Sequence, residues 1–126
     1  MLTQLSLTNF KSWKEIERMD FAPITGLFGT NSSGKTSILQ LLLMLKQTVE
    51  SPDRAQALIF GDERSPADLG AFSDIIHKHD LASSLTWALD WRLPKRLTVS
   101  DLETPEDTLF EGNELRFEAE LKADDG

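Results

Sequence analysis

The sequence predicts an α/β fold in which a strand–loop–helix unit is followed by a largely antiparallel β portion. Three observations predict it. The stretch Gly29–Thr36 reads Gly-Thr-Asn-Ser-Ser-Gly-Lys-Thr, a loop bounded by glycines. A mostly apolar run at 24–28 precedes it, and the strongly helix-forming run Ser37–Lys46 follows it. Further along, residues 84–93 and 114–122 alternate apolar and polar side chains, as half-buried strands do.

The N-terminal residues predict a hairpin. Leu2, Leu5, Leu7 and Phe10 are spaced as on a strand, and residues 16–21 form a second short strand. A turn near residues 12–15 would pair the two strands. The apolar run at 24–28, preceded by Pro23, suits a buried strand that leads into the glycine loop.

The helix after the loop is expected to run to about Val49, with Pro52 ending it. Its apolar residues cover most faces, which predicts burial on more than one side. A short apolar piece at 55–60 follows the helix, and a turn-rich link occupies 65–70.

The second half of the chain predicts one short helix and an antiparallel sheet. Residues 71–79 are expected to be helical, with Phe72, Ile75 and Ile76 facing inward. Residues 84–93 and 114–122 are the two clear strands, and 97–102 is a third candidate between them. Inward residues are expected to be Leu85, Trp87, Leu89, Trp91 and Leu93 in the first strand, and Leu115, Phe117, Ala119 and Leu121 in the second.

These elements predict a single lobe over residues 1–126, because the chain is long enough for one modest core. We divide it into a phosphate-loop core at 1–60, a helical insertion at 61–80 and an antiparallel β portion at 81–126.

The glycine-bounded loop matches the pattern G-x-x-x-x-G-K-[ST], which binds nucleotide phosphates. Gly29 and Gly34 let the backbone turn close to a phosphate, and the amides at the start of the helix attract the anion. Lys35 would stabilise the β and γ phosphates, the catalytic role expected here, and Thr36 would ligate Mg²⁺. The predicted nucleotide contacts in this stretch are Gly29, Thr30, Asn31, Ser32, Ser33, Gly34, Lys35, Thr36 and Ser37.

Composition limits the partners of this segment. Its net charge is −8, and many acids lie late in the chain, so direct binding to nucleic acid is not expected. The chain contains no cysteine, which excludes disulfides and fits a cytoplasmic location. No apolar run reaches the length of a membrane span, and the N-terminus does not read as a signal peptide.

The stretch Leu7–Trp13, Leu-Thr-Asn-Phe-Lys-Ser-Trp, followed by the glycine loop, resembles the opening of the SMC/RecF/OLD-like ATPases. These are ABC-class heads, loosely grouped with AAA ATPases. Residues 68–77 are similar to a segment of the OLD-like bacterial branch. The resemblance implies ATP and Mg²⁺ as cofactors and two heads closing on two nucleotides. It places Lys11 and Ser12 beside the nucleotide, and Trp13 either beside it or packed in the hairpin.

The sequence departs from a complete head of that family. A complete head has an acidic strand end, a signature loop and a switch histidine, and none is found in these 126 residues. The run 85–90 ends in Asp90, but it alternates and lacks a second acid, so we reject it as the acidic motif. Among the glutamines, Gln56 is the best placed as a further metal ligand. We therefore expect an incomplete ABC-type ATPase head, whose hydrolysis depends on residues elsewhere.

The function favoured at this point is ATP binding, and hydrolysis in the complete protein, by a head acting in DNA repair, DNA processing or anti-phage defence. Its partner would be a second head or a nuclease or other DNA-processing protein. One alternative is a non-catalytic nucleotide switch that controls dimerisation or docking. Another is a P-loop small-molecule kinase, which would need more lid arginines than Arg54 and Arg64.

Two other clusters have a structural interpretation. His77, His79 and Asp80, with Asp74 upstream, suggest a metal site, but positions two apart diverge on a helix. Trp87 and Trp91 suit a sheet core better than a platform for stacking bases, because basic neighbours are lacking.

Overall fold

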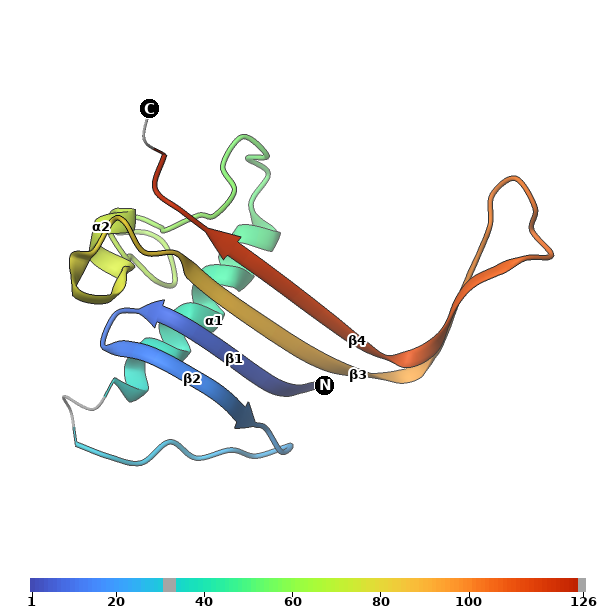
Figure 1. Cartoon of the computed structure of the whole chain (residues 1–126), viewed down its shortest axis with the longest axis horizontal. Coiled ribbons are helices and arrows are strands. Elements are labelled where there is room, and N and C mark those ends of the chain that lie inside the picture. Colours follow the sequence, from blue (N-terminus) through green and yellow to red (C-terminus); the bar gives the residue numbers. More distant parts are fainter. Residues whose placement is uncertain (31–33, 125–126) are drawn as a thin grey trace.

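The computed structural model describes residues 1–30 and 34–124. It contains one four-stranded sheet with the order β2-β1-β3-β4, and the long helix α1 lies against one face of it (Figure 1). In chain order the elements are β1 (Leu2–Phe10), β2 (Trp13–Asp20), α1 (Lys35–Glu50), α2 (Phe72–Ile75), the 3₁₀ turn η1 (His77–His79), β3 (Leu85–Ser100) and β4 (Thr108–Leu121).

The predicted α/β phosphate-loop core is wrong, because the structure is mostly antiparallel sheet. Every strand pair among the described residues is antiparallel. The run 24–28, expected to be a buried strand, forms no strand, and Ile24 and Phe28 are 93% and 95% exposed. A buried strand needs hydrogen-bonded neighbours and cover on both faces. Its apolar composition therefore does not make it a strand where the described residues supply no neighbour.

The antiparallel portion is also not an appendage. Strand β1 lies between β2 and β3, so the N-terminal hairpin and the later strands share one sheet. Leu7 stands opposite Ile16 on one side and Trp87 on the other, which carries the core face across three strands. The N-terminal hairpin itself is confirmed, although its turn is tighter than expected, because Phe10 already pairs with Trp13.

Helix α1 begins and ends close to the predicted positions. Its buried stripe comprises Ser37, Ile38, Leu41, Met44 and Gln47. This stripe joins the core with the inward side chains of the sheet, which include Leu5, Leu7, Leu85, Trp87 and Leu89. Leu39 and Val49 are 54% and 74% exposed, so the helix is less enclosed than its composition predicts.

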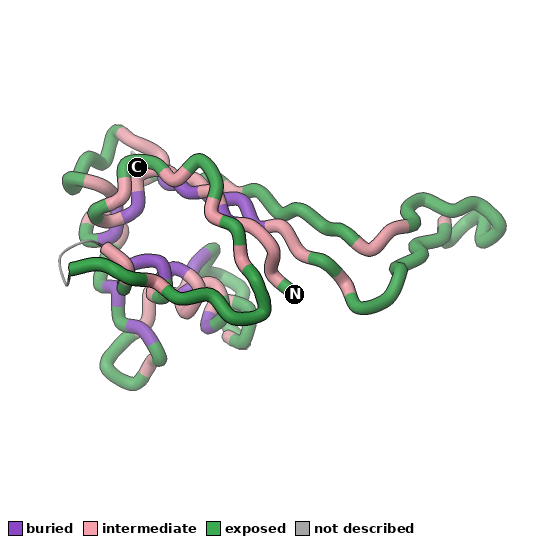
Figure 2. The backbone as a smooth tube through the Cα atoms, turned by 90° about the horizontal axis from the view of Figure 1, so that it is seen from below, coloured by how far each residue is buried: buried purple, intermediate pink, exposed green. Residues whose placement is uncertain are grey.

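The two C-terminal strands form a long hairpin that extends away from the rest of the molecule (Figure 1). Strand β3 joins the two stretches predicted separately at 84–93 and 97–102, and the register slips between Arg92 and Leu97. Pro94 lies within this irregularity, where a residue without an N–H is tolerated. Burial is confined to the body of the molecule, and most of the projecting hairpin is exposed (Figure 2). Phe117, predicted to face inward, is 51% exposed.

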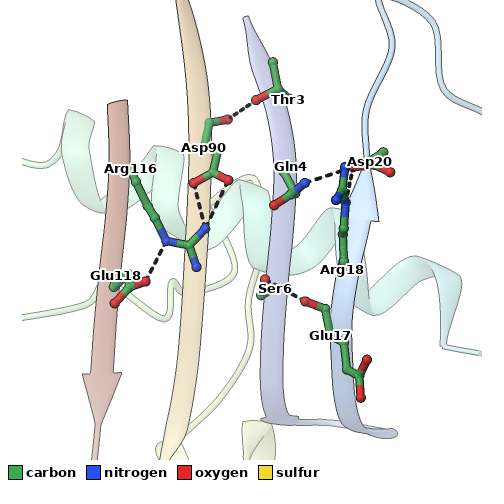
Figure 3. Close-up of polar contacts among 9 residues, drawn as sticks. All are labelled: Thr3, Gln4, Ser6, Glu17, Arg18, Asp20, Asp90, Arg116 and Glu118. Carbon is green, nitrogen blue, oxygen red and sulfur yellow. Dashed lines mark hydrogen bonds and ion pairs between the residues drawn. The ribbon is translucent and has the colours of Figure 1, made fainter. Parts of the chain in front are cut away.

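The face of the sheet opposite α1 carries polar contacts (Figure 3). The Arg116 guanidinium donates to both carboxylate oxygens of Asp90 at 2.9 and 3.0 Å and to Glu118 at 2.6 Å. Hydrogen bonds to Glu118 and then to Asp90 raise the pKa of Arg116. Asp90 is thus paired across the sheet, which agrees with its rejection as the acidic motif.

Gln47 fixes the chain that follows α1. Its side chain is buried, and Nε2 donates to the carbonyls of Ile59 and Ala67 at 2.8 and 3.0 Å. Its Oε1 accepts from the Ala67 amide at 3.2 Å. Gln47→Leu leaves these backbone groups without their partner, so we expect the free energy of unfolding to fall by about 2–3 kcal/mol. Urea unfolding measures this, with Gln56→Leu as the control because the side chain of Gln56 is exposed and donates to the exposed Asp53. Equal unfolding midpoints for both variants would contradict the role.

Candidate functional site

The start of α1 has the features of an anion site. Gly34 precedes the helix in the left-handed conformation with φ 83°, and the Ser37 amide donates to its carbonyl at 3.0 Å. No side chain among the described residues caps this end, and the first turn contains no acid. The N–H groups of a helix start carry partial positive charge, so an anion is favoured there. The chemistry of this end therefore fits a phosphate.

Lys35 lies at the beginning of the helix, and its ammonium group donates to the carbonyl of Gly29. This bond joins the first residue of the motif to its lysine. Thr36 is an exposed residue, whereas Ser37 is buried on the helix face. Thr30 lies within the described residues. Three predicted contacts lie outside them: Asn31, Ser32 and Ser33.

The hairpin of β1 and β2 contacts this loop at Gly34. The Trp13 indole N–H donates to the Gly34 carbonyl at 3.0 Å. A Cβ atom at Gly34 would lie 2.2 Å from Ser12 Oγ and 2.9 Å from Trp13 Nε1. Trp13 also packs against the core cluster. Trp13 therefore packs against the core and also bonds to the loop, and its place beside a nucleotide stays a prediction.

Lys11 lies beside α1. Its ammonium donates to Gln40 Oε1 at 2.6 Å. Burial lowers the pKa of Lys11, and the charge of Asp74 opposes that shift. The Lys11 side chain is thus directed at the helix that begins at the glycine loop.

Residues 75–77 support the Lys11 turn, a contact that the sequence reasoning missed. The Lys11 amide donates to the Ile75 carbonyl at 2.6 Å, and His77 Nδ1 lies 2.7 Å from the Lys11 carbonyl. His79 instead bonds to the Ser73 carbonyl at 2.6 Å. The two histidines therefore serve different backbone groups, and the described residues contain no cluster of metal-ligating side chains. The sequence offered one sign of this contact, because the segment 68–77 resembles part of the OLD-like branch. The sequence reasoning gave that segment no role.

Gln56, the other predicted metal ligand, lies after the C-terminal end of α1. Its side-chain amide donates to Asp53 at 3.2 Å. Its assignment to a metal stays a prediction.

A family model described as an AAA ATPase domain matches residues 1–113. The chain belongs to the AAA ATPase domain family. Comparison of this AAA ATPase domain with curated proteins and with solved structures finds no match. Membership supports an ATPase-type function in general terms, with nucleotide as the expected ligand. Within the described part of the domain, no helix has the length and apolar character needed to cross a membrane.

Proposed function

We propose that this AAA ATPase domain binds ATP with Mg²⁺ at residues 29–36. The observation that carries the proposal is the packing of Gly34. It lies in a left-handed conformation at the uncapped start of α1, and Ser12 and Trp13 leave no space for a side chain at this position. A glycine at this position lets the chain pass closely beside the first hairpin and turn into α1, whose first N–H groups are left for a ligand.

Different described residues would bind the phosphates, the metal and the rest of the nucleotide. The helix start offers N–H groups to phosphate oxygens, and the Lys35 ammonium moves from the Gly29 carbonyl to the β and γ phosphates. Thr36, an exposed residue in the first turn of α1, would hold the metal through its hydroxyl. When bound, Mg²⁺ neutralises charge on the phosphate oxygens. Lys11, Ser12 and Trp13 form the wall beside the nucleotide.

For the complete protein we propose ATP hydrolysis in an SMC/RecF/OLD-like head, acting in the cytoplasm in DNA repair, DNA processing or defence against phage. A second head would complete the site, and the alternative partner is a nuclease or another DNA-processing protein. This finer assignment is supported by the stretch Leu7–Trp13 and its contact with the loop. Fold and family alone do not determine function.

A nucleotide-binding switch is the second candidate. The observation that favours it is Asp90, which ends an apolar run but is paired with Arg116 on the face of the sheet opposite α1. This pairing holds Asp90 on the other face of the sheet from α1, so Asp90 is not positioned to activate water at the start of that helix. ATP would then control association without being hydrolysed by this segment.

The test is calorimetric titration of the folded chain with ATP and Mg²⁺. We expect saturable binding that tripolyphosphate competes for and that adenosine does not, because the proposed contacts are mainly to phosphate. A folded chain without saturable binding overturns the proposal, as does competition by adenosine but not by tripolyphosphate.

A further inference from the structure

The turn at Lys11 is held on both sides of its backbone by one distant segment. Its amide donates to the Ile75 carbonyl, and its carbonyl accepts a hydrogen bond from His77, 66 positions away. Next to it, Phe10 forms a bridge with Ile76, and Phe10, Ile75 and Ile76 are all fully or almost fully buried. Residues 75–77 therefore clamp the tip of the first hairpin.

The clamp holds Lys11 in an unfavourable conformation. Lys11 has φ 49°, in the left-handed region that residues other than glycine seldom adopt. Residues held in this way need support from their surroundings and cluster at functional sites. Since a carbonyl only accepts, His77 must donate from Nδ1, which fixes where its ring proton lies.

The Lys11 ammonium contacts α1 about one helical turn from Thr36, the predicted metal ligand. Gln40, its hydrogen-bond partner, lies four residues after Thr36 on α1. Residues four apart share a face, one turn of about 5.4 Å along the axis. The Lys11 ammonium is thus held on the face that carries Thr36, close to the end of α1 where phosphate is expected. Burial has already removed part of its water shell, which strengthens an interaction with an anion.

We propose that His77 is a positioning residue of the nucleotide site, which acts by holding the Lys11 turn so that the Lys11 ammonium reaches the bound nucleotide. This inference rests on the proposed function. On ligand binding, Lys11 exchanges the amide oxygen of Gln40 for an oxygen of the phosphates. The segment 68–77 is thereby a structural part of the site, although it lies far from the glycine loop in the sequence.

The test measures ATP affinity, with Mg²⁺, for variants of the whole chain. We expect His77→Leu to weaken binding about five- to tenfold, the effect of one lost hydrogen bond transmitted to a charged contact. His77→Asn, which places an N–H donor near the position of Nδ1, should restore affinity to within about twofold. His79→Leu is the matched control, because His79 bonds to Ser73 and not to the turn.

A second comparison separates positioning from general stability. In a Lys11→Met background, His77→Leu should cause no further loss of affinity, because the group that it positions is absent. An equal loss in both backgrounds overturns the inference, and so does unchanged affinity of folded His77→Leu. If the wild-type protein binds ATP and Lys35→Ala does not, the proposed function holds. That conclusion stands even where His77→Leu has no effect on affinity. Absence of wild-type binding defeats the proposed function itself.

If His77→Leu does not fold, the wild-type protein still provides a test. The chain contains two histidines, whose imidazole nitrogens give separate NMR signals. Titration with ATP and Mg²⁺ should move the His77 signal and leave that of His79 in place. Saturation of the protein with an unmoved His77 signal overturns the inference.

Discussion

Lys35→Ala is expected to lower the affinity for ATP with Mg²⁺ at least about 100-fold. Hydrogen bonds to charged groups contribute about 1.5–3 kcal/mol each, and each 1.4 kcal/mol is a factor of ten in affinity. Lys35 is expected to make such bonds to two phosphates. The loss should shrink from ATP to ADP and nearly vanish for AMP, because the lysine serves the β and γ positions.

Lys46→Ala is the matched control for Lys35→Ala. Lys46 lies on the same helix, and its exposed side chain pairs only loosely with Glu50 at 3.9 Å. Its removal takes away one positive charge without touching the helix start, so affinity should change less than about twofold. Calorimetric titration of both variants measures this difference in ATP affinity. Equal losses in the two variants would mean that binding follows overall charge and not the glycine loop.

Gly34→Ala is expected both to abolish ATP binding and to lower the thermal midpoint. The left-handed conformation costs a residue with a Cβ roughly 1–2 kcal/mol. The new Cβ would also lie 2.2 Å from Ser12 Oγ and 2.9 Å from Trp13 Nε1, so these two side chains must shift. That shift breaks the bond from the indole to the Gly34 carbonyl. A single methyl group thus disturbs both the backbone at Gly34 and the neighbouring side chains of Ser12 and Trp13.

Gly26→Ala is the control for this substitution. The three atoms nearest to a Cβ at Gly26 all belong to the ring of Phe28, which is 95% exposed and free to rotate away. The expected changes in thermal midpoint and affinity are small. Differential scanning calorimetry compares the thermal midpoints of the two variants, and titration with ATP compares their affinities. Retained ATP affinity in a folded Gly34→Ala protein would contradict the close packing argued here.

Local patterns in the sequence predicted the elements whose neighbours lie nearby in the chain. The spacing of Leu5, Leu7 and Phe10 predicted β1, and the glycine loop with Pro52 beyond it bounded α1 correctly. The sequence predicted 84–93 and 97–102 as separate strands, since the irregularity around Pro94 interrupts the alternation of β3. Their union into one strand comes from pairing with β4, which no local pattern shows.

The errors share one physical cause. The run 24–28 has the composition of a buried strand, yet strand formation depends on a partner and not on composition. His77 was interpreted through its neighbours His79 and Asp80, whereas its hydrogen-bond partner is Lys11. Contacts between distant segments are decided by the tertiary structure. The glycine motif was easier to identify, because its chemistry lies within one continuous stretch.

The most direct test of the central claim uses the three tryptophans as NMR reporters of where ATP binds. The Trp13 indole N–H bonds to Gly34, whereas Trp87 and Trp91 lie on β3. Titration with ATP and Mg²⁺ should shift the Trp13 indole signal and the amides of Gly34, Lys35 and Thr36, and leave the other two indole signals unmoved. Shifts confined to β3 and β4, or an unmoved Trp13 signal in a saturated and folded protein, would contradict ATP binding at the start of α1.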